Sequence, residues 1–269
     1  MKIVVCIKHV PDVQSERRLE DGHLVRGEDD VLNELDENAV EAAVSLVEEH
    51  GGEVVVLTMG PEDAEDGVRR ALQMGADSGV VVADDDAAGT DVIGTARVLA
   101  AAITRIGGTA PGEVAASSAG TGDVDLVVTG MASLDAMTSM LPGALAATLH
   151  VPAITLATTL EVQEGSVLAT RSSGTVHEVM TAPLPALVSV TDQANEPRYP
   201  NFAAMRAARK KPLEVWDLAD LGLGGADLTS GVQVIEAGES PARQAGTIIT
   251  DAGEGGRRLA AWLVENKLV

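Results

Sequence analysis

Apolar residues in the first half of this chain form short runs, separated by longer segments in which they recur every three or four positions. The runs have the length of buried strands, and the longer segments have the spacing of helices that bury one face. Strands and helices in alternation are typical of a parallel sheet covered by helices. The expected strands are residues 3–7, 54–58, 79–82 and 126–129.

Three helices are expected between these strands. In NELDENAVEAAVSLVEEHGG the apolar residues share one face, and Gly51 ends the helix. The segment EDAEDGVRRALQMGAD repeats this arrangement with Gly75 at its end, and DVIGTARVLAAAITRIGG supplies the third helix. Residues 107–122 are rich in Gly, Ala, Ser and Thr without periodicity, which predicts a mobile surface loop.

A different pattern follows Pro152. Residues 154–190 contain strand-like runs separated by turn residues at Glu164-Gly165 and Ser173-Gly174. This pattern predicts an antiparallel extension of the main sheet.

The last part of the chain is loop-like beyond Trp216, with one strand-like run at 232–235 and a helix at 255–266. Such a tail buries little apolar surface alone, which favours contact with a partner. The complete pattern predicts an α/β protein with three layers, α/β/α, whose mostly parallel, Rossmann-like sheet has an antiparallel extension and a C-terminal arm.

The composition excludes several functions. The 269 residues carry a net charge of -22 and include only two Trp, one Tyr and one Phe, so nucleic acid is not an expected partner. Cys6 is the single cysteine and is expected to be a small buried hydrophobe. The first residues are too charged for a secretory signal, and we expect a soluble cytoplasmic protein without membrane insertion.

A candidate phosphate site follows the fourth strand, in TGMASLDAMTSMLPGALA. Ligands bind beyond the carboxyl ends of strands in open α/β sheets, where loop amides and a helix N-terminus hold phosphate. Gly130, Ser133, Thr138 and Ser139 suit that role. The alternative is an ordinary turn between a strand and a helix, and the chain has neither GxGxxG nor GxxxxGK[ST].

Two further segments fall at the same expected edge of the sheet. Asn33, Glu34, Leu35 and Asp36 open the first helix, where the Asn and Asp are also explained as N-cap residues. Met59 ends another strand, before a Gly-Pro turn. Three strand ends converging on one crevice make a nucleotide site plausible.

Catalytic and metal-binding patterns are weak. The five His have no HxxxH or HExxH spacing, and no Ser lies in GxSxG. Lys8, His9 and Asp12 follow the first strand, where a turn with a solvated Lys explains them. We therefore expect no catalytic residue and no metal.

Several segments together resemble the beta subunit of electron transfer flavoproteins, almost from end to end. They are VVCIKHVPD, NELDENAVEAA, LTMGPEDAEDGVRRALQMGAD, VVTGMASLD, LPALVSVTDQANEPRYPNFAAMRAARKKPLEVW and DAGEGGRRLAAWLVE. The resemblance implies an electron carrier subunit, not an enzyme. Its partner would be an alpha subunit that holds most of the FAD, while this chain binds a structural AMP.

The resemblance also implies which residues bind the AMP. They lie at the first and second strand ends, the first helix start and the glycine-led loop: Cys6, Asn33, Glu34, Leu35, Asp36, Met59, Gly130, Met131, Ala132, Ser133, Leu134, Asp135, Ala136, Met137, Thr138, Ser139, Met140 and Leu141.

Partner contacts follow from the same resemblance. Phe202, the only Phe, matches the family's anchor for partner dehydrogenases, and Arg206 begins the basic cluster completed by Arg209, Lys210 and Lys211. Residues 1–226 would form the nucleotide-binding domain, and residues 227–269 the arm that packs on the alpha subunit. Without the resemblance, Phe202 would be interpreted as a core residue.

In the family, electrons pass from primary dehydrogenases, such as acyl-CoA dehydrogenases, to a membrane quinone oxidoreductase. One alternative is the bifurcating type, whose beta subunit binds a second FAD and meets NADH. Another is an orphan nucleotide-binding protein without a redox role. This chain departs from the family pattern at Ser172, where an acidic residue is usual, and in its less polar phosphate loop.

Overall fold

The computed structural model describes residues 1–20, 23–27, 29–109, 120–238, 241–243, 246, 248 and 250–269. The chain divides into two compact units, Met1–Ile235 and Glu236–Val269. Most of the loop expected at 107–122 lies outside the described residues.

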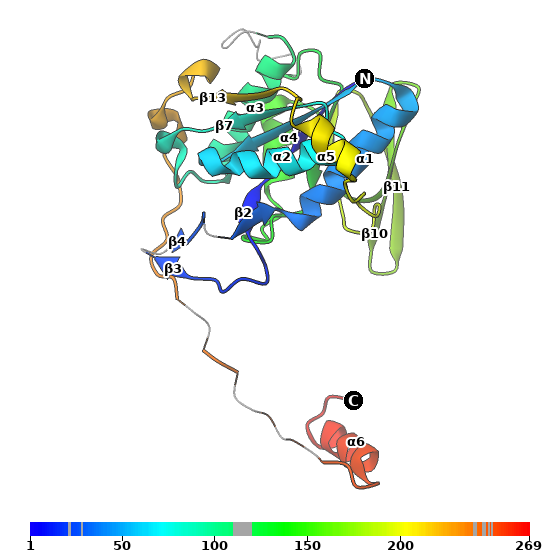
Figure 1. Ribbon diagram of the computed structural model, residues 1–269. Helices are drawn as coiled ribbons and strands as arrows, with labels where there is room; N and C mark the ends of the chain where they lie inside the picture. Colours follow the sequence, from blue (N-terminus) through cyan, green and yellow to red (C-terminus); the bar gives the residue numbers. More distant parts are fainter. Residues whose placement is uncertain are drawn as a thin grey trace. The chain divides into compact units, whose positions relative to one another are not determined.

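The first unit is built on one nine-stranded sheet, in the order β11-β10-β9-β12-β8-β1-β6-β7-β13 (Figure 1). All pairs from β9 to β13 are parallel, whereas β10 is antiparallel to both β9 and β11. The predicted parallel sheet with an antiparallel extension is therefore confirmed. The strands are β1 Lys2–Cys6, β6 Glu53–Met59, β7 Ser78–Val82, β8 Leu126–Gly130, β9 Ala153–Gln163, β10 Ser166–Ser173, β11 Val176–Pro183, β12 Ala186–Val190 and β13 Leu213–Trp216.

Helices cover both faces of this sheet (Figure 1). Side chains alternate along a strand, so Ile3 and Val5 of β1 face one core while Val4 and Cys6 face the other. The first core lies under α1 Glu34–His50, α2 Glu65–Met74 and α5 Phe202–Ala208, and the second under α3 Val92–Ile106 and α4 Leu141–Leu149. The three-layer prediction is confirmed.

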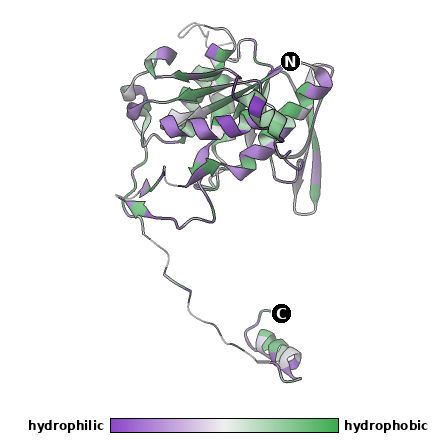
Figure 2. Ribbon diagram, viewed as in Figure 1, coloured by the Kyte–Doolittle hydropathy of each residue, from purple (hydrophilic) through white to green (hydrophobic). Residues whose placement is uncertain are grey.

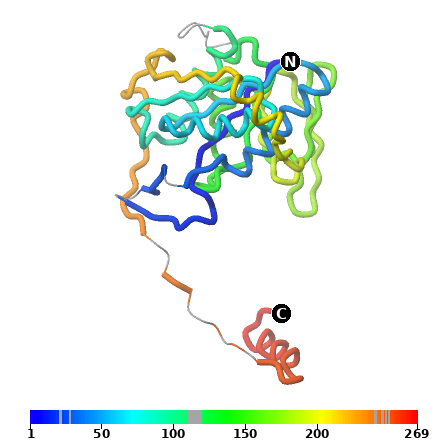
Figure 3. Tube along the Cα trace, viewed as in Figure 1, coloured from blue at the N-terminus to red at the C-terminus, as the bar shows by residue number. Residues whose placement is uncertain are grey.

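Several short elements were not predicted. The segment between β1 and α1 forms two small antiparallel pairs of strands, and Figure 3 shows it in dark blue. Its strands are β2 His9–Pro11, β3 Leu19–Glu20, β4 His23–Leu24 and β5 Asp30–Leu32. The 3-10 helices are η1 Glu62–Ala64, η2 Asp85–Ala87, η3 Ala219–Leu221 and η4 Gly225–Leu228.

Two local predictions were wrong. The second turn of the extension is at Gly174-Thr175, one residue later than expected, because β10 extends to Ser173. Residues 232–235 are not a strand, since no strand in the described part of the chain pairs with them.

The second unit contains α6, Gly255–Glu265. Leu259, Trp262 and Val264 are all exposed on it, and Figure 2 shows hydrophobic and hydrophilic positions mixed along this helix. The unit therefore buries little of its own apolar surface. No helix in the described part of the chain has the length and apolar character that crossing a membrane requires.

Candidate functional site

The predicted strand ends meet at one edge of the sheet. Strand β1 lies between β8 and β6, and Cys6 is aligned with Thr129 on one side and Leu57 on the other. The helix after β1 covers one face, whereas α3, which leads into β8, covers the other. The chain thus changes direction at β1 and β8, and open α/β sheets bind ligands beyond the strand ends at such a switch point. We call this region the crevice.

Asn33 joins this crevice to helix α1. It occupies the N-cap position, but its side chain makes no capping hydrogen bond. Instead its Nδ2 donates to the carbonyl oxygen of Ala132 at 2.9 Å, and the N–H of Leu134 donates to its Oδ1 at 3.1 Å. The capping interpretation was wrong, because both polar atoms of this buried amide hold the loop after β8.

Asp36 closes the crevice from the same helix. Its buried carboxylate accepts the N–H of Lys8 at 2.8 Å and also that of Gly130. Burial raises the pKa of Asp36 to about 7, although these hydrogen bonds act against the rise. Gly130 is required here, since a Cβ would lie 2.7 Å from the oxygen of Leu35 and clash with Oδ1 of Asp36.

Asp135 forms ion pairs with two basic side chains near the crevice. Its carboxylate is only 2% exposed, and it pairs with Lys8 Nζ at 2.8 Å and with Arg26. Burial alone would raise the pKa of Asp135, but hydrogen bonds from Lys8 and Arg26 hold it below its ordinary value. Lys8 is therefore ion-paired and only partly solvated, which corrects the expectation of a solvated Lys.

The segment between β1 and α1 also contacts the loop after β8. Arg17 donates to the carbonyl oxygen of Leu134 at 2.9 Å, and Arg26 pairs with Asp135. Neither arginine was predicted to belong to the site. The available signal was the presence of three Arg, at positions 17, 18 and 26, before the first helix of an acidic chain.

The outer part of the loop leaves backbone donors free. Met137 and Ser139 have left-handed φ angles of 51° and 53°. In the described structure the N–H groups of Thr138, Ser139 and Met140 have no hydrogen-bond acceptor, and α4 begins directly after them. Successive free amides before a helix N-terminus are what a phosphate binds, so these residues fit a nucleotide phosphate.

The remaining predicted site residues surround these groups. Cys6 and Met59 border the second core, whereas Glu34 and Ala136 are exposed. Burial raises the pKa of the Cys6 thiol to about 12, and the charge of Asp36 adds to the rise. The thiol is therefore protonated near neutral pH and is a poor nucleophile or metal ligand.

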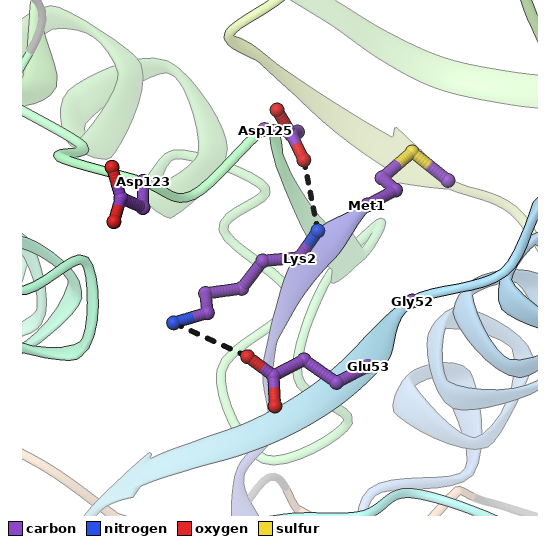
Figure 4. Close-up of a pocket in the computed structure, with 6 residues that line it drawn as sticks. All are labelled: Met1, Lys2, Gly52, Glu53, Asp123 and Asp125. Carbon is purple, nitrogen blue, oxygen red and sulfur yellow. Dashed lines mark hydrogen bonds and ion pairs between the residues drawn. The ribbon is translucent and has the colours of Figure 1, made fainter.

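A separate shallow cavity of about 360 Å³ lies at the opposite edge of the sheet, where the strands begin (Figure 4). Lys2 Nζ pairs there with Glu53 at 3.2 Å, and the N–H of Lys2 donates to Asp125 at 2.8 Å. These groups satisfy each other. No cluster of His, Cys, Asp and Glu suited to a metal occurs among the residues that the structure describes.

The predicted docking residues are exposed. Phe202 begins α5 and is 89% exposed, so the core interpretation is excluded, and Arg206 follows in the same helix. Lys211 differs from the rest of the basic cluster. Its ammonium group donates to the carbonyl oxygens of Leu72, Gly75 and Ala76 at the end of α2, so it is occupied within the chain.

The comparisons with known proteins agree with this arrangement. A family model described as the electron transfer flavoprotein domain matches residues 21–221. The chain is 37% identical to the electron transfer flavoprotein subunit beta of Mycobacterium leprae (strain TN), over 99% of both chains. It is 31% identical to the Bacillus subtilis (strain 168) protein of the same name, over 93% of this chain and 91% of the relative. It is also 31% identical to the caffeyl-CoA reductase-Etf complex subunit CarD of Acetobacterium woodii, over 93% of this chain and 92% of the relative.

Proposed function

Because this chain belongs to the electron transfer flavoprotein family as a beta-type subunit, we propose that it carries AMP in a cytoplasmic heterodimer. The alpha subunit holds most of the FAD. The dimer accepts electrons from primary dehydrogenases, such as acyl-CoA dehydrogenases, and passes them to a membrane quinone oxidoreductase. Family members are electron carriers, and this subunit supplies binding surfaces rather than catalytic residues.

The AMP proposal rests on the backbone N–H groups of Thr138, Ser139 and Met140, which have no acceptor in the described structure. They precede α4, whose N-terminal dipole favours a bound anion. Asn33 and Asp36 fix the start of the same loop against α1. These residues would bind and orient the phosphate.

The surfaces for partners are separate from the crevice. Phe202 and Arg206 are exposed on α5, and an exposed aromatic beside Arg suits a small docking surface for dehydrogenases. Residues 227–269 would pack on the alpha subunit, which would cover the apolar residues of α6.

The bifurcating alternative requires the same crevice to hold a second FAD. The rim of the crevice carries Ala136, Met137, Thr138, Ser139 and Met140, of which only two have polar side chains. That composition favours the smaller nucleotide. In the orphan alternative the unusual Ser172 would matter, and its Oγ shares a hydrogen bond with His177 Nδ1 at 2.8 Å.

The test is to purify the chain with its co-purifying partner, denature the complex, and identify the released nucleotides by chromatography and mass spectrometry. AMP equimolar with this chain, and FAD equimolar with the larger subunit, is the expected result. FAD released by this chain alone would establish the bifurcating alternative. Absence of any nucleotide would overturn both proposals.

A matched pair of variants tests where the nucleotide binds. Ser139→Asp puts a carboxylate beside the free amides, where it would compete with phosphate, and Asp tolerates the left-handed φ at this position. Thr175→Asp adds the same charge in the exposed turn between β10 and β11. Loss of AMP from the first variant alone supports the crevice, and equal retention by both contradicts it.

A further inference from the structure

Helix α1 contacts both the nucleotide crevice and the segment before Phe202. Its start holds the crevice loop through Asn33 and Asp36. Further along, the side chains of Asn38 and Asn195 each donate to the other residue's carbonyl oxygen, at 3.0 and 2.9 Å. Asn38 is buried, so this reciprocal contact fixes the segment after β12 directly on the helix.

Arg198 makes the strongest of these contacts. Its guanidinium donates to Glu41 at 2.8 and 3.0 Å and to Glu48 at 2.6 and 2.9 Å. Its backbone N–H also donates to Glu41, at 3.0 Å. Glu41 and Glu48 are seven residues apart, which is two helical turns, so they lie on one face of α1.

Separating residues 195–199 from α1 requires a large free energy. Hydrogen bonds between charged partners are stronger than neutral ones, and Glu41 is only 11% exposed. Tyr199, next in the chain, lies under Arg70 at 5.4 Å from its ring centroid, and Arg70 in turn pairs with Glu37 of α1 at 3.0 Å. Three contacts therefore connect residues 195–199 to one helix, directly or through Arg70.

We propose that α1 couples the nucleotide crevice to the docking segment, with Arg198 as the positioning residue, so that AMP binding stabilises the segment that presents Phe202. The proposal rests on the function proposed above, because it needs AMP in the crevice. A ligand that binds only the folded crevice suppresses every local opening that disrupts it. If residues 195–199 open together with α1, their openings are suppressed as well.

The first experiment is hydrogen exchange of the full-length chain, stripped of nucleotide, with and without AMP, with AMP binding measured in parallel by calorimetry. The N–H of Arg198 is the reporter, since Glu41 accepts it. At an AMP concentration 100 times its Kd, protection of this amide should rise by up to about 100-fold. Protection confined to the crevice and α1 would overturn the coupling while leaving the AMP proposal intact. Failure to bind AMP would overturn both.

Variants separate coupling from general stability. In Arg198→Met the crevice and α1 should still gain protection on AMP binding, whereas residues 195–199 should not. Arg198→Lys keeps the charge but loses the planar fork, so it should recover only part of the response. Arg171→Met is the matched control, because it removes another forked Arg–Glu pair, with Glu178, away from α1. An AMP response of residues 195–199 that survives Arg198→Met at full size would refute the role of Arg198.

Discussion

The side chain of Asn33 is bonded to the backbone of Ala132, 99 residues further along the chain, at 2.9 Å. Asn33 stands where a helix cap is expected, yet it holds the crevice loop instead of the helix. The two roles predict different responses to substitution.

Asn33→Asp separates these roles. Asp is as good an N-cap as Asn, but it cannot donate to the oxygen of Ala132. The free energy of unfolding should fall by about 1–3 kcal/mol, because a buried acceptor loses its partner. Asn201→Asp is the control, since Asn201 does cap α5 by accepting the N–H of Ala204 at 2.9 Å. Urea denaturation should show a loss in the first variant alone, and equal effects would restore the capping role.

Substitution of Gly130 tests the close approach of α1 to β8, and substitution of Gly143 is the control. Gly130→Ala places a Cβ against Leu35 and Asp36, which should lower the free energy of unfolding by about 1–3 kcal/mol or more. Gly143 lies in α4, and no atom comes within 4 Å of the point that a Cβ would occupy there. Gly143→Ala should therefore stabilise the chain by about 0.5–1 kcal/mol. Thermal midpoints that move in opposite directions would agree with this, and a neutral Gly130→Ala would not.

Asp36 should make stability depend on pH near neutrality. Burial raises its pKa from 3.8 to about 7, so the folded chain holds this proton more tightly than the unfolded chain. The contribution to stability is fully present below pH 3.8 and is lost as the pH rises through about 7. Denaturation across this range, with Asp36→Asn as reference, should show the wild type losing stability relative to the variant. A constant difference would contradict the raised pKa.

Lys211 should matter more than its neighbour Lys210. It donates to three carbonyl oxygens at the end of α2, at 3.0, 3.2 and 2.5 Å. Lys211→Met should lower the free energy of unfolding by about 1–3 kcal/mol, because these acceptors lose a charged donor. Lys210→Met changes an exposed side chain and should stay within about 0.5 kcal/mol of the wild type. Similar losses in both variants would show that the carbonyl contacts contribute little.

Much of the fold could be predicted because its central strands are short apolar runs and its helices repeat one buried face. Strand β13 was missed because only Trp216 of its four residues is buried, so it lacks that pattern. Residues 232–235 have the pattern, but none of the strands that the structure describes pairs with them. Strand formation depends on such partners, which local sequence does not specify.

The edge at which the candidate site lies could be predicted, because neighbouring parallel strands end at a common edge. Its internal bonds could not be predicted, because the partners of Asn33 and Lys8 lie 99 and 127 residues away in sequence. Local patterns favour a cap at Asn33 and a solvated role for Lys8. In the folded chain Asn33 bonds to Ala132 and not to the end of α1, and Lys8 pairs with Asp135 in place of water.

The bonds from Asn33 and Asp36 mean that the floor of the crevice is assembled before any ligand arrives. Among the predicted site residues, only Glu34 and the rim, residues 136–140, are exposed to solvent. Under the proposed function, an incoming phosphate would have to order a few rim side chains, at about 0.5–1.5 kcal/mol each, rather than the whole site. Preorganisation of this kind would reduce the entropic penalty of association for a nucleotide.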